Sequence, residues 1–149
     1  FIELAGEINT NMPHWVVDRV AEALDRSAGR GLNKAKILVM GVAYKKNIDD
    51  MRETPSLRLI ELLEERGARA DYHDPHVPVI PPTREHASLT GRASVALAPE
   101  TVAGYDAVLI ATDHAAVDYK ALVAAARLVV DTRNACAKAG LTGGNIVKA

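Results

Sequence analysis

The sequence predicts an α/β fold in which a doubly wound parallel sheet lies between two layers of helices, preceded by a long N-terminal helix. Short apolar runs alternate with helical segments along the 149 residues, as parallel βαβ units require. The first run, residues 37–40, is apolar at every position, as expected for a parallel strand covered on both faces. A clear helical period precedes that run. Together these features predict three αβα layers.

The N-terminal segment is predicted to be helical in two parts. Residues 1–8 read as the end of one helix, and Asn9, Asn11 and Pro13 predict a break, a kink or a new start. The second part, residues 12–28, carries apolar side chains at helical spacing: Val16, Val17, Val20, Ala21 and Leu24. Gly29 and Gly31 end it. We therefore expect a boundary near residues 30–33, between a helical region at 1–30 and a domain at 31–149.

The remaining elements follow from apolar runs and turn residues. Core strands are expected at 36–42, 69–73, 107–111 and 128–131, with short strands at 93–97 and 145–148. Helices are expected at 55–66, from about Pro99, and within 115–126. Residues 77–92 contain three prolines and no period, which predicts a loop.

The connection between the first strand and its helix is unusually long. It has roughly a dozen residues, where such connections usually need about 2–6. It carries Lys45, Lys46 and Arg52 among acidic residues. This composition favours a segment that binds an anion.

Polar residues follow four of the predicted strands, at 44–46, 73–74, 112–114 and 131–134. Parallel strands bring their carboxyl ends to one edge of the sheet, which is where ligands bind in such folds. Lysine and arginine there could hold phosphate oxygens. Gly41 stands alone, without the G-x-G-x-x-G turn. The layout is therefore Rossmann-like but lacks the usual NAD-binding turn.

Each cation has an alternative interpretation. Lys45 could be a solvent-exposed lysine rather than a ligand. Arg52 could pair with Asp49 or Glu53 near the start of the helix, and Arg133 could pair with Asp131. Spacing alone leaves these alternatives open.

No metal site is expected. His73, Asp113 and His114 match no compact zinc motif. Asp74-Pro75 reads as a simple turn and Asp113 as a helix cap.

Two further side chains have simple structural interpretations. Cys136 is the lone cysteine, and we expect an inert, partly buried thiol rather than a nucleophile. Trp15 is expected to pack at a helix–helix contact.

Composition bounds the possible partners. The 18 basic and 19 acidic residues nearly cancel, so neither nucleic acid nor a membrane surface is an expected partner. One cysteine and the lack of a long apolar run favour a reducing, cytoplasmic location. The chain starts without methionine in a helical stretch, so we expect it to be part of a longer protein.

Several segments resemble one enzyme family. GVAYKKNIDDMRETPS resembles the G-x-A-[FY]-K-x-x-x-x-D-x-R-E-[ST]-P segment of the UDP-glucose/GDP-mannose dehydrogenase family. YHDPHV, DAVLIATDH and VVDTRNA resemble its C-terminal UDP-binding domain, and FIELAGEINTNMPHWVVDRVAEAL resembles the end of its central helical region. ELAGEIN and ATDH are most similar to the branch that oxidises UDP-N-acetylhexosamines, in particular UDP-N-acetylglucosamine.

The resemblance implies a chemistry and a set of binding residues. The family oxidises the C6 alcohol of the sugar to a carboxylate, in two NAD-dependent hydride transfers through a cysteine-linked thiohemiacetal. By position, Tyr44 and Lys45 match the pair that contacts the UDP-sugar, and Arg133 matches an arginine near the UDP moiety. Arg52 matches the arginine that reaches the NAD cofactor.

Two departures limit what this chain can do alone. The family's catalytic cysteine lies in a glycine-rich central segment that is absent here, and Cys136 is not its counterpart. The N-terminal glycine fingerprint for NAD is absent as well. We therefore expect NAD to be held mainly outside this chain, the chain alone to be inactive, and homo-oligomers to form through the N-terminal helix. The alternative is a stand-alone nucleotide-binding module with a regulatory or assembly role and no catalysis.

Overall fold

The structure is a computed structural model that describes residues 2–43, 55–83 and 86–149, with side chains from Met12 onward. Five parallel strands form its sheet, in the order β2-β1-β3-β4-β5. They are β1 (Lys36–Met40), β2 (Arg69–His73), β3 (Ala107–Ile110), β4 (Val129–Asp131) and β5 (Ile146–Lys148). The predicted α/β fold with a parallel sheet is confirmed.

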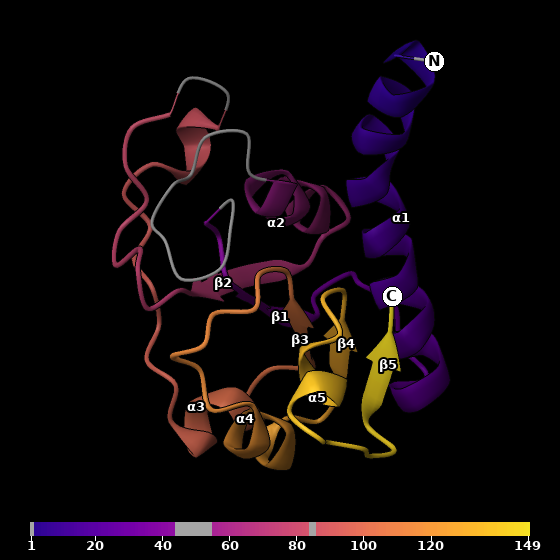
Figure 1. Ribbon diagram of the computed structural model, residues 1–149, viewed down its shortest axis with the longest axis vertical. Coiled ribbons are helices and arrows are strands. Elements are labelled where there is room, and N and C mark those ends of the chain that lie inside the picture. Colours follow the sequence, from indigo (N-terminus) through magenta and orange to yellow (C-terminus); the bar gives the residue numbers. More distant parts are fainter. Residues whose placement is uncertain (1, 44–54, 84–85) are drawn as a thin grey trace.

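Helices cover both faces of the sheet (Figure 1). Helices α1 (Ile2–Ala28) and α2 (Pro55–Glu65) share one core with Ile37 and Val39 of β1. On the other face, Leu38 and Met40 pack with α3 (Pro99–Ala103), α4 (Tyr119–Ala125) and α5 (Ala135–Lys138). Because successive strand side chains point to opposite faces, one apolar strand supplies both cores.

Helix α1 runs without interruption through Pro13, so the expected break at residues 9–13 is wrong. Proline removes one backbone hydrogen bond, but its fixed φ is itself helical, which lets the helix continue. The first turns of α1 extend beyond the rest of the ribbon (Figure 1).

The apolar stripe of α1 is buried within this chain. Val20 and Leu24 are fully buried in the core that α1 shares with α2 and the sheet. The stripe is therefore covered within this chain and is not a free surface for the homo-oligomers expected to form through this helix.

Trp15, expected to pack between helices, is 48% exposed, and the Arg19 guanidinium lies 5.9 Å from its ring centroid. Trp15 is one position away from the stripe and therefore points about 100° off the buried face. Its interpretation as a packing residue is wrong for the part of the chain described.

The connection from β2 to α3 contains little regular structure. It holds a short 3₁₀ helix, η1 (Ala87–Leu89), and a single antiparallel bridge between Val79 and Ala93. The strand expected at residues 93–97 does not form beyond this bridge, because Ser94 and Val95 donate to different segments, at Pro78 and Tyr72. The Tyr72 hydroxyl, hydrogen-bonded to the carbonyls of Val77 and Arg92, holds the connection against the sheet.

Candidate functional site

Gly41 follows β1 and turns the chain out of the sheet. Its φ is +88°, a backbone conformation that side-chain-bearing residues rarely adopt. A Cβ at this position would lie 2.5 Å from the Cβ of Thr112 and 2.7 Å from its carbonyl oxygen. Glycine therefore permits both the turn and the close approach of the segment after β3.

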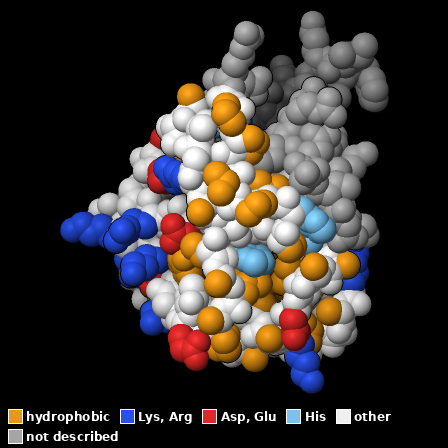
Figure 2. Space-filling view, turned by 90° about the vertical axis from the view of Figure 1, so that its left-hand side faces the viewer, with side chains coloured by type: hydrophobic (Ala, Val, Ile, Leu, Met, Phe, Trp, Pro, Cys, Tyr) orange, Lys and Arg blue, Asp and Glu red, His pale blue; other side chains and the backbone are white. Residues whose placement is uncertain are grey.

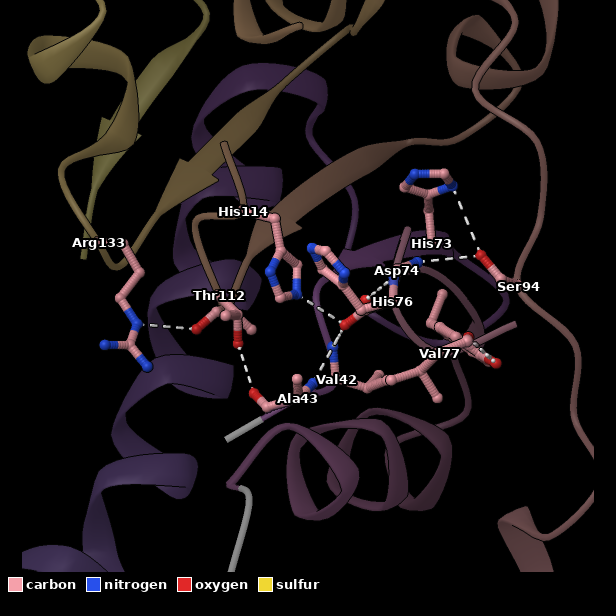
Figure 3. A network of polar contacts seen from close by, with 12 residues as sticks. Val42, Ala43, His73, Asp74, His76, Val77, Ser94, Thr112, His114 and Arg133 are labelled. Carbon is pink, nitrogen blue, oxygen red and sulfur yellow. Dashed lines mark hydrogen bonds and ion pairs between the residues drawn. The ribbon is translucent and has the colours of Figure 1, made fainter. Parts of the chain in front are cut away.

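The Asp74 carboxylate binds the two residues that follow Gly41 (Figure 3). Its Oδ2 accepts the backbone N–H of Val42 at 2.9 Å and that of Ala43 at 3.1 Å. Its Oδ1 accepts the N–H of His76 at 2.8 Å. The last bond is the turn expected at Asp74-Pro75, but the first two link β2 to the end of β1, which the sequence interpretation missed.

His114 completes the surroundings of this carboxylate. Its Nε2 lies 2.9 Å from Oδ2 of Asp74, and both side chains are almost fully buried. A carboxylate only accepts hydrogen bonds, so Nε2 carries the proton. Burial alone would raise the pKa of Asp74. The hydrogen bonds from Val42, His76 and His114 outweigh burial and hold that pKa below its usual value.

Thr112 holds the other backbone group of Ala43. Its Oγ1 donates to the Ala43 carbonyl at 2.9 Å, while the Ala43 N–H is bound by Asp74. Side chains from the tails of two strands, β2 and β3, therefore fix the backbone after β1. We call Val42, Ala43, Asp74, Thr112 and His114 the carboxyl-edge cluster.

Arg133 lies at the same edge, after β4 (Figure 3). Its Nε donates to the carbonyl of Ala111 at 2.9 Å, and the residue is exposed. The alternative pairing with the Asp131 side chain is wrong, because the Asp131 oxygens accept the backbone N–H groups of residues 133, 135 and 136 instead. In the described part of the chain, the terminal guanidinium nitrogens of Arg133 have no hydrogen-bond or ion-pair partner.

The other predicted ligands cannot be located. Tyr44, Lys45 and Arg52 lie outside the described residues. Their roles, and the alternative pairing of Arg52 with Asp49 or Glu53, stay predictions. What the structure fixes is the point from which they follow, since Ala43 directly precedes Tyr44 in the chain.

The expectation that Asp113 caps a helix is wrong. The cap of α4 is Asp118, whose carboxylate accepts the N–H of Ala121 at 3.1 Å, while Asp113 lies 3.5 Å from the Lys138 amine. Ala115 and Ala116 form a turn before α4, so the helix begins after Asp118 rather than at Asp113.

The Cys136 thiol is 1% exposed. Burial, followed by the nearby Asp131 carboxylate, raises its pKa to about 11. This thiol is protonated at neutral pH, which agrees with the expected inert role.

The described residues hold neither a metal-ligand cluster nor a helix that could span a membrane. No three of their His, Cys, Asp or Glu side chains are grouped so that they could hold a metal ion. None of their helices is long and apolar enough to cross a membrane.

A separate apolar groove of about 370 Å³ lies between α3 and α4, next to the end of β2. Figure 2 shows a face of the molecule on which hydrophobic and histidine side chains lie side by side. Leu97, Val102 and Leu122 line the groove with His73 at its wall, and among the described residues no lysine or arginine lines it. Arg133 is not one of these lining residues.

Comparison with known proteins identifies the family to which this chain belongs. The pattern of the UDP-glucose/GDP-mannose dehydrogenase family, UDP binding domain, matches residues 38–138. That range includes the whole carboxyl-edge cluster and Arg133. The chain belongs to the UDP-glucose/GDP-mannose dehydrogenase family.

Relatives of this UDP-binding domain are longer proteins. The UDP-N-acetyl-D-mannosamine dehydrogenase of Methanococcus maripaludis is 33% identical over 114 residues, which are 76% of this chain and 23% of the relative. The solved UDP-D-ManNAc dehydrogenase of Pyrococcus horikoshii has a TM-score of 0.76 at 28% identity, over 99% of this chain and 32% of its own. The solved NDP-N-acetyl-D-galactosaminuronic acid dehydrogenase of Methanosarcina mazei Go1 has a TM-score of 0.74 at 25% identity. The match covers 98% of this chain and 30% of that protein's chain. The chain thus spans roughly a quarter to a third of the relatives that it matches.

Proposed function

We propose that this chain is the C-terminal nucleotide-sugar-binding part of an NAD-dependent UDP-sugar 6-dehydrogenase. The protein would oxidise the C6 alcohol of the sugar to a carboxylate. That change removes four electrons, so two NAD molecules are reduced for each sugar. In this proposal Tyr44 and Lys45 contact the UDP-sugar, Arg133 lies near the UDP moiety, and Arg52 reaches the cofactor.

One observation carries the proposal: the strand tails that hold the family's motif residues contact one another. Gly41 lies against Thr112, Asp74 binds Val42 and Ala43, and Arg133 donates to Ala111. The terminal nitrogens of exposed Arg133 have no partner among the described residues, and an arginine at this edge can bind a diphosphate as a two-pronged donor. The family's described UDP-binding domain supports the same ligand.

The sugar is proposed to be a UDP-N-acetylhexosamine. The sequence interpretation favoured the glucosamine epimer. Two of the compared relatives are named for N-acetylmannosamine, which favours that epimer. We therefore propose UDP-N-acetylmannosamine as the first substrate to test, with UDP-N-acetylglucosamine beside it.

The rest of the enzyme would lie outside these residues. The catalytic cysteine and most of the NAD site are proposed to belong to the part of the relatives that this chain does not cover. Residues 1–30 would be the end of a central helical region and 31–149 the UDP-sugar-binding domain. Homo-oligomers through α1 remain part of the proposal, and half-exposed Met12 and Trp15 are the candidate contacts.

Titration with UDP, followed by NMR shifts, tests the nucleotide site. We expect weak binding, with a Kd on the order of 0.1–1 mM, because the sugar-side contacts are absent. Lys45→Ala and Arg133→Ala should each remove a charge-assisted contact worth roughly 1.5–3 kcal/mol and abolish detectable binding. Arg52→Ala should have little effect, because Arg52 is assigned to the cofactor.

Arg127→Ala is the matched control. Arg127 precedes β4 as Arg133 follows it, and its side chain is 64% exposed. It should bind UDP like wild type. No shift in wild type at several millimolar UDP contradicts the proposed site, and loss of binding in Arg52→Ala alone contradicts the assignment of roles.

A further inference from the structure

We propose that Asp74 and His114 are positioning residues of the nucleotide site, which fix the backbone from which the ligand-binding segment after β1 begins and tie it to Arg133. The inference rests on the proposed function and extends it to two residues that contact no ligand themselves.

The backbone N–H groups that follow Gly41 need hydrogen-bond acceptors that the sheet does not supply. The pairing of β1 with both neighbours ends at Met40, and Gly41 makes one further backbone bond, to His73. The N–H groups of Val42 and Ala43 are buried beyond the last pair and need other acceptors. Oδ2 of Asp74 accepts both of them.

Burying the Asp74 carboxylate has a cost in free energy. A buried carboxylate loses its hydration, so it is stable only with several strong donors. Asp74 has three backbone donors and His114, and the imidazole fixes the oxygen that serves Val42 and Ala43. A single well-placed acceptor oxygen thus sets the direction of two consecutive peptide units.

Residues after β3 connect the backbone of Ala43 to Arg133. Thr112 holds the carbonyl of Ala43, and the carbonyl of Ala111 holds Nε of Arg133. His114 lies two positions after Thr112 on the same segment. The short tail of β3 therefore connects the backbone of Ala43 to Arg133, and Asp74 joins this tail through His114 (Figure 3).

Asp74→Asn tests the inference, with Asp106→Asn as the matched control. Asp106 accepts the N–H of Lys36 at 2.8 Å, at the opposite end of β1. Each substitution replaces a carboxylate that binds the β1 backbone. We expect Asp74→Asn to raise the Kd for UDP about tenfold and to move the amide proton shifts of Val42 and Ala43. Asp106→Asn should leave the Kd within about twofold of wild type, since it lies at the far edge.

A pair of His114 variants decides the question if Asp74→Asn does not fold. His114→Gln keeps an N–H donor near the Nε2 position, whereas His114→Phe removes it. We expect His114→Gln to retain most of the UDP affinity that His114→Phe loses. A purely structural role would lower the stability of both variants without separating their affinities.

The outcomes are distinguishable. Wild type that shows no UDP shifts overturns the proposed function and this inference with it. Folded Asp74→Asn that binds UDP like wild type overturns the inference alone, and so do His114→Gln and His114→Phe with equal affinities.

Discussion

Gly41 shows how a single residue can serve both the fold and the site. It combines a left-handed backbone with contact against Thr112, so two separate costs oppose any side chain there. Sequence reasoning marked this glycine only as the absence of a dinucleotide turn. Its requirement comes from a residue 71 positions later, 112 against 41, which no local pattern contains.

Gly41→Ala should therefore destabilise the protein by more than its φ alone explains. Gly91 is the matched control, because its φ is +85° and nothing lies within 4 Å of a Cβ placed there. We expect Gly91→Ala to cost about 1–2 kcal/mol from backbone strain. Gly41→Ala should cost about 1–3 kcal/mol more, from overpacking against Thr112.

Urea unfolding of the two variants and wild type measures this difference. Equal losses of unfolding free energy in both would show that Thr112 moves aside without cost.

The position of Arg133 at the carboxyl edge could be predicted from the sequence, whereas the hydrogen bonds of Asp74 could not. A lone cation after a strand is visible in the sequence, and its place at the carboxyl edge follows from parallel topology. The long-range partners of Asp74 are the backbone amides of Val42 and Ala43 and the side chain of His114, which lies 40 positions away. The sequence feature that could have indicated this role is a carboxylate directly after β2, the strand that pairs with β1.

Helix α1 is the element that departs most from expectation. The period of its stripe was predicted correctly, and Val20 and Leu24 face the core. The continuity of α1 was not predicted, because one proline was given more weight than the long run of helix-compatible residues around it. The five strands of the sheet were predicted to within one or two residues, although the further strand expected at residues 93–97 does not form. Helix α5, with four residues, is too short to show a period.

Burial of the stripe predicts a stability effect in α1. Leu24→Ala should lower the unfolding free energy by about 2–5 kcal/mol, because it opens a cavity in the core shared with α2. Asp25→Ala, on the exposed side of the same turn, should stay within about 0.5 kcal/mol of wild type.

Thermal or denaturant unfolding compares the two variants. Identical midpoints would mean that α1 contributes nothing to the core of residues 31–149. A loss confined to Leu24→Ala would show that α1 stabilises the core that it shares with α2 and the sheet.

For the molecule as a whole, we predict that this chain alone forms no NADH from NAD and either UDP-N-acetylhexosamine. The 149 residues hold neither the family's cysteine segment nor its glycine fingerprint. Their single thiol is buried and protonated at neutral pH. The measurement is NADH absorbance with both sugar epimers, using Cys136→Ala as the control variant. Turnover that Cys136→Ala removes would make Cys136 a nucleophile and contradict the prediction.

The strand order has a consequence for the time course of folding. Strand β1 lies between β2 and β3, and Met40 pairs with Ile110, which is 70 positions later. At about 5–20 residues per second, a ribosome needs roughly 4–14 s to reach β3 after it has made β1. During that interval one edge of β1, which is apolar from Ile37 to Met40, lacks its native neighbour, and such an edge can pair with a foreign strand. The nascent chain is therefore most open to misassembly between the synthesis of β1 and that of β3.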